Sequence, residues 1–170
     1  MKTRAAVLYS HGLDHPYSET TPLKIEEVTL KDPGPGEVLV KMFAAGLCHS
    51  DLSAINGVRP RPVPMVIGHE ASAKVEKIGE GVTNLKIGDH VVLVFVPSCG
   101  HCMPCMEGRP ALCEPGAESN VNGTLLSGQS KIYQSEKKIS HHVGVSAFAE
   151  HAVVSIHSCV KINKDIDPVE

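Results

Sequence analysis

The sequence lacks any apolar stretch long enough to cross a membrane. Its longest uninterrupted apolar run, residues 91–96, is far shorter than the roughly 20 residues that a spanning helix requires. The apolar core and cleavage site of a secretory leader are also missing, because residues 1–4 lead directly into a short β-like segment. We therefore expect a cytoplasmic protein with no membrane partner.

The sequence also lacks a concentration of positive charge. Its 16 Lys and Arg residues are scattered among 19 Asp and Glu residues, and the formal net charge is −3. Only Lys137 and Lys138 are adjacent basic residues. Because nucleic-acid-binding domains usually present a basic patch or stripe, we expect no nucleic-acid partner.

A third absence concerns dinucleotide binding. No G-x-G-x-x-G fingerprint occurs in the 170 residues, so a Rossmann cofactor domain is not expected within them. The length itself suits one ordinary domain. At the end of the sequence, Asp167, Pro168 and Glu170 have the pattern of a helix start, with a capping residue, a first-turn proline and a later glutamate. We therefore expect this chain to be an N-terminal piece of a longer protein.

Short β-like segments separated by turn residues dominate what is present. The Pro-Gly repeat at 33–36 predicts a tight turn, because proline presets φ and glycine permits positive φ. Such regular punctuation is typical of a barrel or sandwich. A short helix is expected at 50–55, whereas 114–146 is weakly patterned and is expected to be a long excursion. The expected strands are 3–9, 23–30, 37–45, 71–78, 90–96, 148–156 and 159–162.

Four of the six cysteines are closely spaced, in the pattern C-x2-C-x2-C-x7-C. Four thiolates that converge on one point make a closed tetrahedral zinc site. Disulfides are disfavoured, because cysteines three apart bridge poorly and no secretion signal is present. An iron–sulfur cluster remains an alternative, although the bacterial ferredoxin run has a shorter last gap. The four residues are Cys99, Cys102, Cys105 and Cys113.

Two upstream clusters contain a second set of metal-binding residue types. Cys48, His69 and Glu70 offer a thiolate, an imidazole and a carboxylate, which are the ligand types of an open catalytic zinc. Each residue also has a simpler explanation, because a buried cysteine is commonly a small hydrophobe and a lone histidine is commonly a packing or surface residue. The residues alone therefore leave a second metal site open.

Taken together, these motifs make the chain resemble the catalytic domain of zinc-dependent alcohol dehydrogenases of the medium-chain dehydrogenase/reductase family. The resemblance implies that residues 1–170 form one GroES-like catalytic domain. That fold would be mainly β with a few short helices, a partly open β-barrel, and a zinc-stapled lobe at about 97–114. The motifs that carry the resemblance lie at 1–9, 33–38, 46–51, 68–70, 79–82, 99–113 and 146–150.

The resemblance implies catalytic roles for five residues. Cys48 and His69 would bind a catalytic zinc, and Glu70 would lie close enough to exchange onto it. Asp51 would hold the His69 ring, which fixes its tautomer and raises its basicity as a ligand. Ser50 would contact the substrate alcohol and begin its proton relay.

The resemblance also implies how the cofactor and substrate bind. His49 would face the pyrophosphate of the cofactor, and Phe95, with His142 and Val143, would line the substrate pocket. The four clustered cysteines would bind a structural zinc. The third protein ligand of the catalytic zinc, a cysteine in the family, would lie beyond residue 170. Cys159 is expected to be a packing residue in its strand.

Two positions depart from the family pattern. Ser53 stands where many members have a histidine that completes the proton relay, and Ala73 stands where a glycine is usual. The full-length enzyme implied by the resemblance would reversibly oxidise a small-molecule alcohol to an aldehyde or ketone with NAD or NADP. It would form a homo-oligomer, and this chain alone would be inactive. The alternatives are the glutathione-dependent formaldehyde dehydrogenase branch and a non-catalytic, zinc-stabilised binding module of the same fold.

Overall fold

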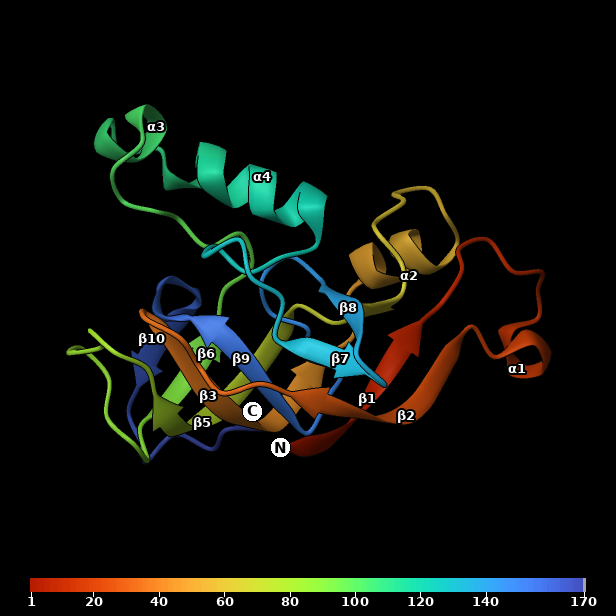
Figure 1. The fold of residues 1–170 in the computed structure, drawn as a ribbon, viewed down its shortest axis with the longest axis horizontal. Helices are drawn as coiled ribbons and strands as arrows, with labels where there is room; N and C mark the ends of the chain where they lie inside the picture. The colour runs from red at the N-terminus through yellow and green to blue at the C-terminus, as the bar shows by residue number, and fades with distance from the viewer. Residues whose placement is uncertain (170) are drawn as a thin grey trace.

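A computed structural model describes residues 1–169 of the chain, and it confirms the mainly β, barrel-based fold (Figure 1). Five strands close into a barrel in the order β1-β2-β7-β8-β4, and five others form an adjoining sheet in the order β10-β6-β5-β3-β9. The barrel strands are β1 (Lys2–Leu8), β2 (Leu23–Leu30), β4 (Met65–Val66), β7 (Ile132–Gln134) and β8 (Lys137–His141). The sheet strands are β3 (Glu37–Gly46), β5 (Glu70–Ile78), β6 (His90–Leu93), β9 (His151–Ser155) and β10 (Cys159–Ile162).

The helices described within residues 1–169 are short. The α-helices are α1 (Tyr17–Thr20), α2 (His49–Ile55), α3 (Met103–Met106) and α4 (Glu114–Asn122). Two 3₁₀ turns complete the set, η1 (Pro110–Leu112) and η2 (Ile156–Ser158). None of these helices is long and apolar enough to span a bilayer.

Strand β3 is buried on both faces along its first half and joins the two apolar cores. It pairs with β5 along one edge and with β9 along the other. Because alternate side chains of a strand point to opposite faces, Val38 and Val40 pack with Val75 in the core of the sheet, whereas Leu39 packs with Val7 in the core of the barrel.

A third apolar cluster attaches helix α2 to the barrel. Ala54 and Ile55, from the end of α2, pack against Leu8, Met65 and Ile67. All five side chains are at most 9% exposed. Because a buried apolar side chain of this size contributes roughly 1.5–3 kcal/mol, this cluster fixes the position of the helix that follows Cys48.

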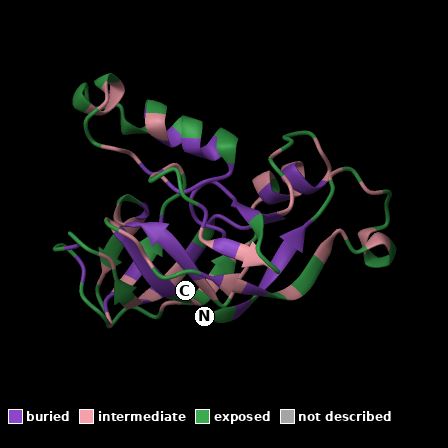
Figure 2. Cartoon of the chain, in the orientation of Figure 1, coloured by how far each residue is buried: buried purple, intermediate pink, exposed green. Residues whose placement is uncertain are grey.

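The four-cysteine segment projects from the strands as a lobe that contains α3 and α4 (Figure 1). Residues of α3 are exposed or half-buried, whereas α4 turns a buried side toward the rest of the molecule (Figure 2). Met103 and Met106 are 66% and 75% exposed. Helix α3 therefore has little apolar packing of its own.

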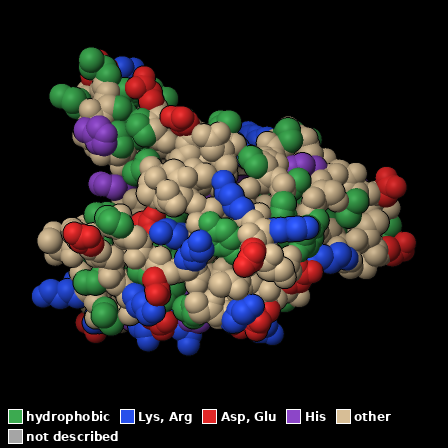
Figure 3. Space-filling model, viewed as in Figure 1, with side chains coloured by type: hydrophobic (Ala, Val, Ile, Leu, Met, Phe, Trp, Pro, Cys, Tyr) green, Lys and Arg blue, Asp and Glu red, His purple; other side chains and the backbone are tan. Residues whose placement is uncertain are grey.

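The surface drawn in Figure 3 has acidic and basic side chains interspersed over the strands, and hydrophobic side chains at the tip of the lobe. Basic side chains of the described residues do not gather on this face. The buried acid Glu37 is fully paired, because Lys131 lies 3.1 Å away and the Gly34 N–H and Ser127 hydroxyl donate to it at 2.7 and 2.6 Å. These contacts explain why a strand can begin with glutamate directly after the predicted turn at 33–36.

The expectation of a long excursion at 114–146 is wrong. That segment contains α4 and the hairpin of β7 and β8, which closes the barrel by pairing with β2 and β4. The buried residues of α4 are Gly116, Ser119 and Asn120. Because all three are small or polar, hydrophobic periodicity could not reveal the helix.

Other boundaries also differ from expectation, and β9 spans His151–Ser155 rather than 148–156. Strand β6 ends at Leu93 rather than at residue 96, because the Val94 N–H donates to the Ser158 carbonyl and Val96 has a φ of 56°, which an extended strand does not tolerate. At the end of the chain, the Asp167 carboxylate accepts a hydrogen bond from the Val169 N–H at 2.9 Å, in a turn. The expected helix start includes Glu170, which lies outside the described residues.

His141, at the end of β8, is a buried neutral histidine. Its Nε2 accepts a hydrogen bond from the backbone N–H of Lys131 at 3.1 Å, and its Nδ1 has no partner among the described residues. Burial, and to a smaller extent the charges of Lys138 and Lys131, lower its pKa to about 3. The unfolded chain therefore binds a proton here, at a pKa of roughly 6.5, that the folded chain does not bind.

Because the folded-state pKa is depressed, this histidine's contribution to stability is present above about pH 6.5 and is lost as the pH falls toward 3. In the wild type, this histidine should lower the free energy of unfolding by about 2 kcal/mol as the pH falls from 6.5 to 5. We expect His141→Gln, whose amide can accept the same hydrogen bond, to lack that decrease. Urea unfolding across that range measures the difference. The exposed His157→Gln should keep the wild-type dependence, and an equal dependence in His141→Gln would contradict the assignment.

Candidate functional site

The four cysteines of the lobe converge on one point. One ligand atom from each of Cys99, Cys102, Cys105 and Cys113 lies within 4.8 Å of the other three. No disulfide joins any cysteine within residues 1–169. Four thiols at this separation have the donor set and closeness of a tetrahedral zinc site, so the cluster is consistent with a structural zinc.

Backbone N–H groups stabilise negative charge on two of these sulfurs. The Cys99 Sγ accepts from His101 and Cys102 at 3.5 and 3.3 Å, and the Cys113 Sγ accepts from Cys99 and Gly116 at 3.1 and 3.4 Å. The His101 N–H, followed by that of Cys102, lowers the pKa of the Cys99 thiol to about 7 against the effect of burial. Burial, together with the neighbouring thiols, raises the pKa of the Cys105 thiol to about 12. The loop therefore favours the thiolate, the form that binds metal, at Cys99 and not at Cys105.

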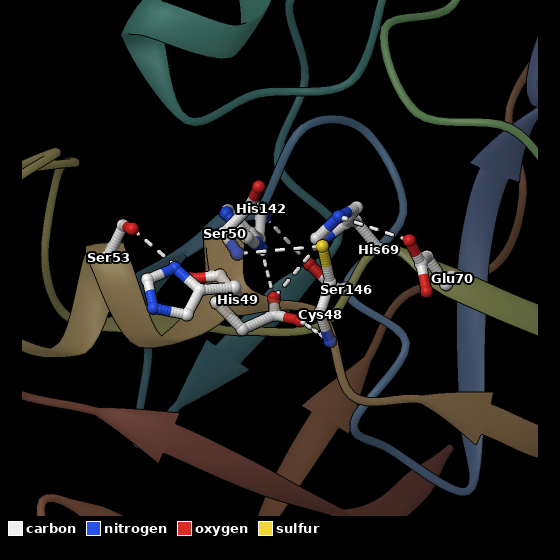
Figure 4. A network of polar contacts seen from close by, with 9 residues as sticks. Cys48, His49, Ser50, Ser53, His69, Glu70, His142 and Ser146 are labelled. Atoms are coloured by element: carbon white, nitrogen blue, oxygen red, sulfur yellow. Dashed lines mark hydrogen bonds and ion pairs between the residues drawn. The ribbon is translucent and has the colours of Figure 1, made fainter.

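Cys48, His69 and Glu70 form a second cluster, in which one ligand atom from each residue lies within 4.8 Å of the others. Cys48 directly precedes α2, His69 directly precedes β5, and Glu70 is the first residue of that strand. The His69 Nε2 is 3.9 Å from the Glu70 Oε1. His69 is buried and Glu70 is exposed, so the cluster is open on one side (Figure 4). Sulfur, nitrogen and oxygen donors in an open arrangement fit a zinc site that can accept a substrate.

Gly68 allows the chain to pass close to the loop at 147–148 just before His69. Its φ is +94°, and a Cβ there would lie 2.6 Å from the backbone nitrogen of Phe148. The N–H groups of Ala147 and Phe148 donate to the carbonyls of Gly68 and Ile67, both at 2.9 Å. Only glycine fits this approach, which fixes the position from which the His69 side chain extends.

Asp51 orients two members of the second cluster. Its buried carboxylate accepts hydrogen bonds from the His69 Nδ1 at 3.0 Å and from the Cys48 backbone N–H at 3.2 Å. The His142 Nδ1 also lies 3.4 Å from the carboxylate, without hydrogen-bond geometry. Although burial opposes ionisation, the His142 and His69 imidazoles hold the pKa of Asp51 below its ordinary value. An ionised Asp51 keeps the proton of His69 on Nδ1 and leaves Nε2 for a metal.

A cavity of about 140 Å³ adjoins this cluster. Its walls contain Ser50 and His69. The three residues predicted to line a substrate pocket, Phe95, His142 and Val143, also lie in its walls. The structure therefore brings the predicted pocket residues to the predicted metal ligands.

Three polar residues in the same walls were not predicted from the sequence, namely Arg59, Arg61 and Asn120. The available signal was the Arg-Pro-Arg-Pro run at 59–62, shortly before the Gly-His-Glu motif. Asn120 gave no local signal, because it reaches the cavity from α4, in the segment for which no helix was predicted.

Other predicted residues lie apart from the cavity walls. His49 is exposed at the start of α2, and its ring lies on the side of Ser53, away from His69 and Glu70 (Figure 4). The Ser53 hydroxyl donates to the His49 carbonyl at 3.1 Å.

Two further residues lie in the core of the sheet. Ala73 is fully buried in β5. Cys159 packs against the same core, and burial raises the pKa of its thiol to about 12. Both are packing residues, as was expected for Cys159.

Known proteins resemble this chain over most of its length. Residues 34–164 match the family described as the alcohol dehydrogenase GroES-like domain. The chain is 43% identical over 164 residues to the NDMA-dependent alcohol dehydrogenase of Amycolatopsis methanolica, and 38% identical over 164 residues to the S-(hydroxymethyl)glutathione dehydrogenase of Photobacterium damsela subsp. piscicida. Each match covers 96% of this chain and 42% of the relative.

The fold is also that of a solved alcohol dehydrogenase. The chain matches the crystal structure of benzyl alcohol dehydrogenase from Acinetobacter calcoaceticus with a TM-score of 0.85 and 33% sequence identity. The match covers 99% of this chain and 43% of that chain. This chain therefore spans about two fifths of the length of the relatives that it matches.

The two cysteine-containing clusters should respond differently to loss of a ligand. We expect Cys113→Ser to lower the melting temperature clearly and to lose a tightly held zinc, because metal binding to a closed cluster contributes folding free energy directly. Cys48→Ser should melt close to the wild type, because its cluster is open. Thermal melts with elemental analysis measure both effects.

Cys159→Ser is the matched control for these variants, because Cys159 lies outside both clusters. It should keep the wild-type zinc content. If Cys48→Ser melts lower than Cys113→Ser and loses the tight zinc, the structural and catalytic assignments are reversed. Iron in place of zinc would instead favour the iron–sulfur alternative.

Proposed function

The chain belongs to the family of alcohol dehydrogenase GroES-like domains, and we propose that residues 1–170 are the catalytic domain of a zinc-containing alcohol dehydrogenase. The proposed reaction is the reversible oxidation of an alcohol to an aldehyde or ketone with NAD or NADP. The observation that supports it most is the convergence of Cys48, His69 and Glu70, of which His69 lines one cavity together with Ser50.

In the proposed mechanism, two groups of side chains hold metal. Cys48 and His69 would hold the catalytic zinc, with Glu70 close enough to exchange onto it, and the four cysteines of the lobe would hold a structural zinc. When bound, zinc supplies Lewis-acid polarisation that lowers the pKa of the alcohol, and the nicotinamide accepts a hydride. The contribution of the chain is to hold the ligands, shape the pocket and move the proton.

Ser50 is proposed to take up the proton of the alcohol. It lies at the start of α2 and shares the cavity wall with His69, and its backbone N–H points at the Cys48 Sγ at 3.5 Å. Its hydroxyl would accept the hydrogen of the substrate O–H and pass a proton outward. Ser53, three residues on, is hydrogen-bonded to its own helix and is not basic. The proton would therefore leave through water or the ribose of the cofactor.

The remaining site residues are proposed to bind rather than react. His49 follows Cys48 in the chain and is exposed, which suits contact with an anionic pyrophosphate. Phe95, His142 and Val143 would form the walls against which the carbon chain of the alcohol packs. Asp51 would position His69 through the 3.0 Å hydrogen bond.

A second candidate is the oxidation of S-(hydroxymethyl)glutathione. It is supported by the relative of that name, which is 38% identical to this chain. The cavity of about 140 Å³ is smaller than the roughly 300–1,000 Å³ of pockets for drug-sized ligands, but a neighbouring cavity of about 500 Å³ shares His69 and Phe95 with it. Cavity volume therefore does not separate the two substrates, and their relative turnover decides between them.

The proposed function predicts turnover when this chain is joined to a nicotinamide-binding domain. That protein should oxidise primary or secondary alcohols, followed by the absorbance of reduced nicotinamide, and this chain alone should show no turnover. Cys48→Ser should lower kcat/KM by more than the roughly 10–100-fold cost of losing an outer hydrogen-bond partner of a metal ligand. Cys159→Ser should retain activity. A zinc-loaded protein that oxidises no alcohol would favour a non-catalytic binding module.

The proton pathway gives a separate prediction. Ser53→His adds a group that titrates near neutrality, so it should shift the pH dependence of kcat if position 53 can take part in the relay. Ser53→Ala removes the hydroxyl without adding a titrating group, and should keep the wild-type pH profile. An unchanged profile in Ser53→His would show that this position lies outside the relay.

A further inference from the structure

Two arginine residues line the cavity beside Ser50 without an acidic partner. Arg59 and Arg61 contribute to its walls, and no Asp or Glu does so among the described residues. Neither takes part in an ion pair within residues 1–169. By contrast, Arg4 pairs with Glu150 at 2.9 Å, and Arg109 pairs with Glu107. The two cavity arginines are therefore available to an anionic ligand.

The loop that carries these arginines is held against helix α2. The ring of His11 lies between two backbone carbonyls, with Nδ1 2.7 Å from that of Ala54 and Nε2 2.8 Å from that of Arg61. The Arg59 N–H donates to the Ser53 carbonyl at 2.8 Å. Because Ala54 and Ser53 belong to α2, these contacts fix the distance between the arginines and Ser50.

A buried amide in the same cavity lacks a partner. Asn120 is 7% exposed and lines the cavity, and its Oδ1 has no hydrogen-bond partner among the described residues. Rotation of the terminal amide would place its N–H₂ donors at the same position. Because a buried polar group without a partner is costly, a polar ligand that reached this amide would be stabilised by the hydrogen bond that the amide lacks.

We propose that Arg61, with Arg59 and Asn120, binds the carboxylate of a short hydroxy acid whose hydroxyl group is the one oxidised. The inference rests on the proposed function and names its substrate class. A guanidinium presents N–H donors in a planar fork that matches a carboxylate. The small cavity limits the length of the chain between the carboxylate and the hydroxyl.

In the reaction, the carbinol carbon would give a hydride to the nicotinamide, and the hydroxyl oxygen would release a proton that Ser50 passes on to water or the ribose of the cofactor. The product is the corresponding oxo acid. The carboxylate stays bound to the arginines and is unchanged by the reaction. The arginines therefore act on substrate choice and not on the redox step.

The two arginines should contribute unequally to binding of the carboxylate. Arg61 is half-buried, so its hydrogen bonds to a carboxylate are partly shielded from water. Arg59 is exposed, and water and salt screen its charge. Loss of Arg61 should therefore weaken binding more than loss of Arg59.

The first experiment uses this chain with zinc and needs no nicotinamide. Calorimetry compares the dissociation constants of butanoate and 1-butanol, which differ in the carboxylate. We expect the wild type to bind butanoate more tightly than 1-butanol. Arg61→Gln should reduce this preference for butanoate roughly tenfold. Arg59→Gln should reduce it by a smaller factor, roughly two- to threefold. The preference should also fall as salt is added.

Arg4→Gln is the matched control, because it removes the same charge at an exposed position outside this cavity. It should keep the wild-type preference. Butanoate that binds only through zinc would show equal preference in the wild type and in both cavity variants. That result would overturn the proposal.

The second experiment separates this inference from the proposed function. With a nicotinamide-binding domain present, the ratio of kcat/KM for 4-hydroxybutanoate to that for 1-butanol should fall roughly tenfold in Arg61→Gln. An unchanged ratio with both alcohols oxidised would overturn the inference and leave the proposed function standing. Binding of butanoate through the arginines without oxidation of any alcohol would overturn the proposed function and leave the anion site supported.

S-(Hydroxymethyl)glutathione is assayed alongside, because it carries carboxylates of its own. If Arg61→Gln lowers turnover of this adduct alone, the arginines bind glutathione and the assignment to a short hydroxy acid is wrong. If it lowers turnover of 4-hydroxybutanoate and not of the adduct, the short hydroxy acid is supported.

Discussion

One buried carboxylate, that of Asp51, holds together the segments that build the site. It accepts hydrogen bonds from the Cys48 backbone and from the His69 ring, which lie in separate parts of the sequence. The bond to Nδ1 decides which nitrogen of His69 remains for a metal. Apolar packing of Ala54 and Ile55 keeps helix α2, and with it Asp51, against the barrel. Because removing one partner of a buried charged group is strongly destabilising, the helix and the ligand loop act as a unit.

The two cysteine-containing clusters depend on different kinds of support. The second cluster lies against packed strands, and its ligands are fixed by the Asp51 carboxylate and by the close approach of Gly68 to Phe148. The lobe has little such support, because Met103 and Met106 of α3 are mostly exposed. Small units with too little core usually rely on a metal or disulfides. Convergence of four thiols in the lobe is therefore consistent with a structural metal that takes the place of apolar packing.

The parts of the fold that sequence predicted well are those in which local pattern and turn chemistry agree. Strands β2 and β10 have the predicted bounds, and β3 follows directly from the Pro-Gly turn before it. Prediction failed for α4 because its buried face is made of small and polar residues. It failed at the end of β6 because the positive φ of Val96 is set by contacts with Val143 and neighbouring segments, which an apolar run does not reveal.

In the candidate site too, some residues could be predicted from the sequence and others could not, for a physical reason. Metal ligands come from short motifs, so their residue types and spacing are visible locally, and a resemblance to a family can carry them. The residues that would choose the substrate reach the cavity through contacts between distant segments. Arg61 is held by His11, 50 residues earlier in the chain, and Asn120 comes from a helix with no apolar periodicity. Such contacts depend on which loop folds over which cavity. The candidate metal ligands could therefore be named from the sequence, whereas the proposed preference for a charged substrate required the structure.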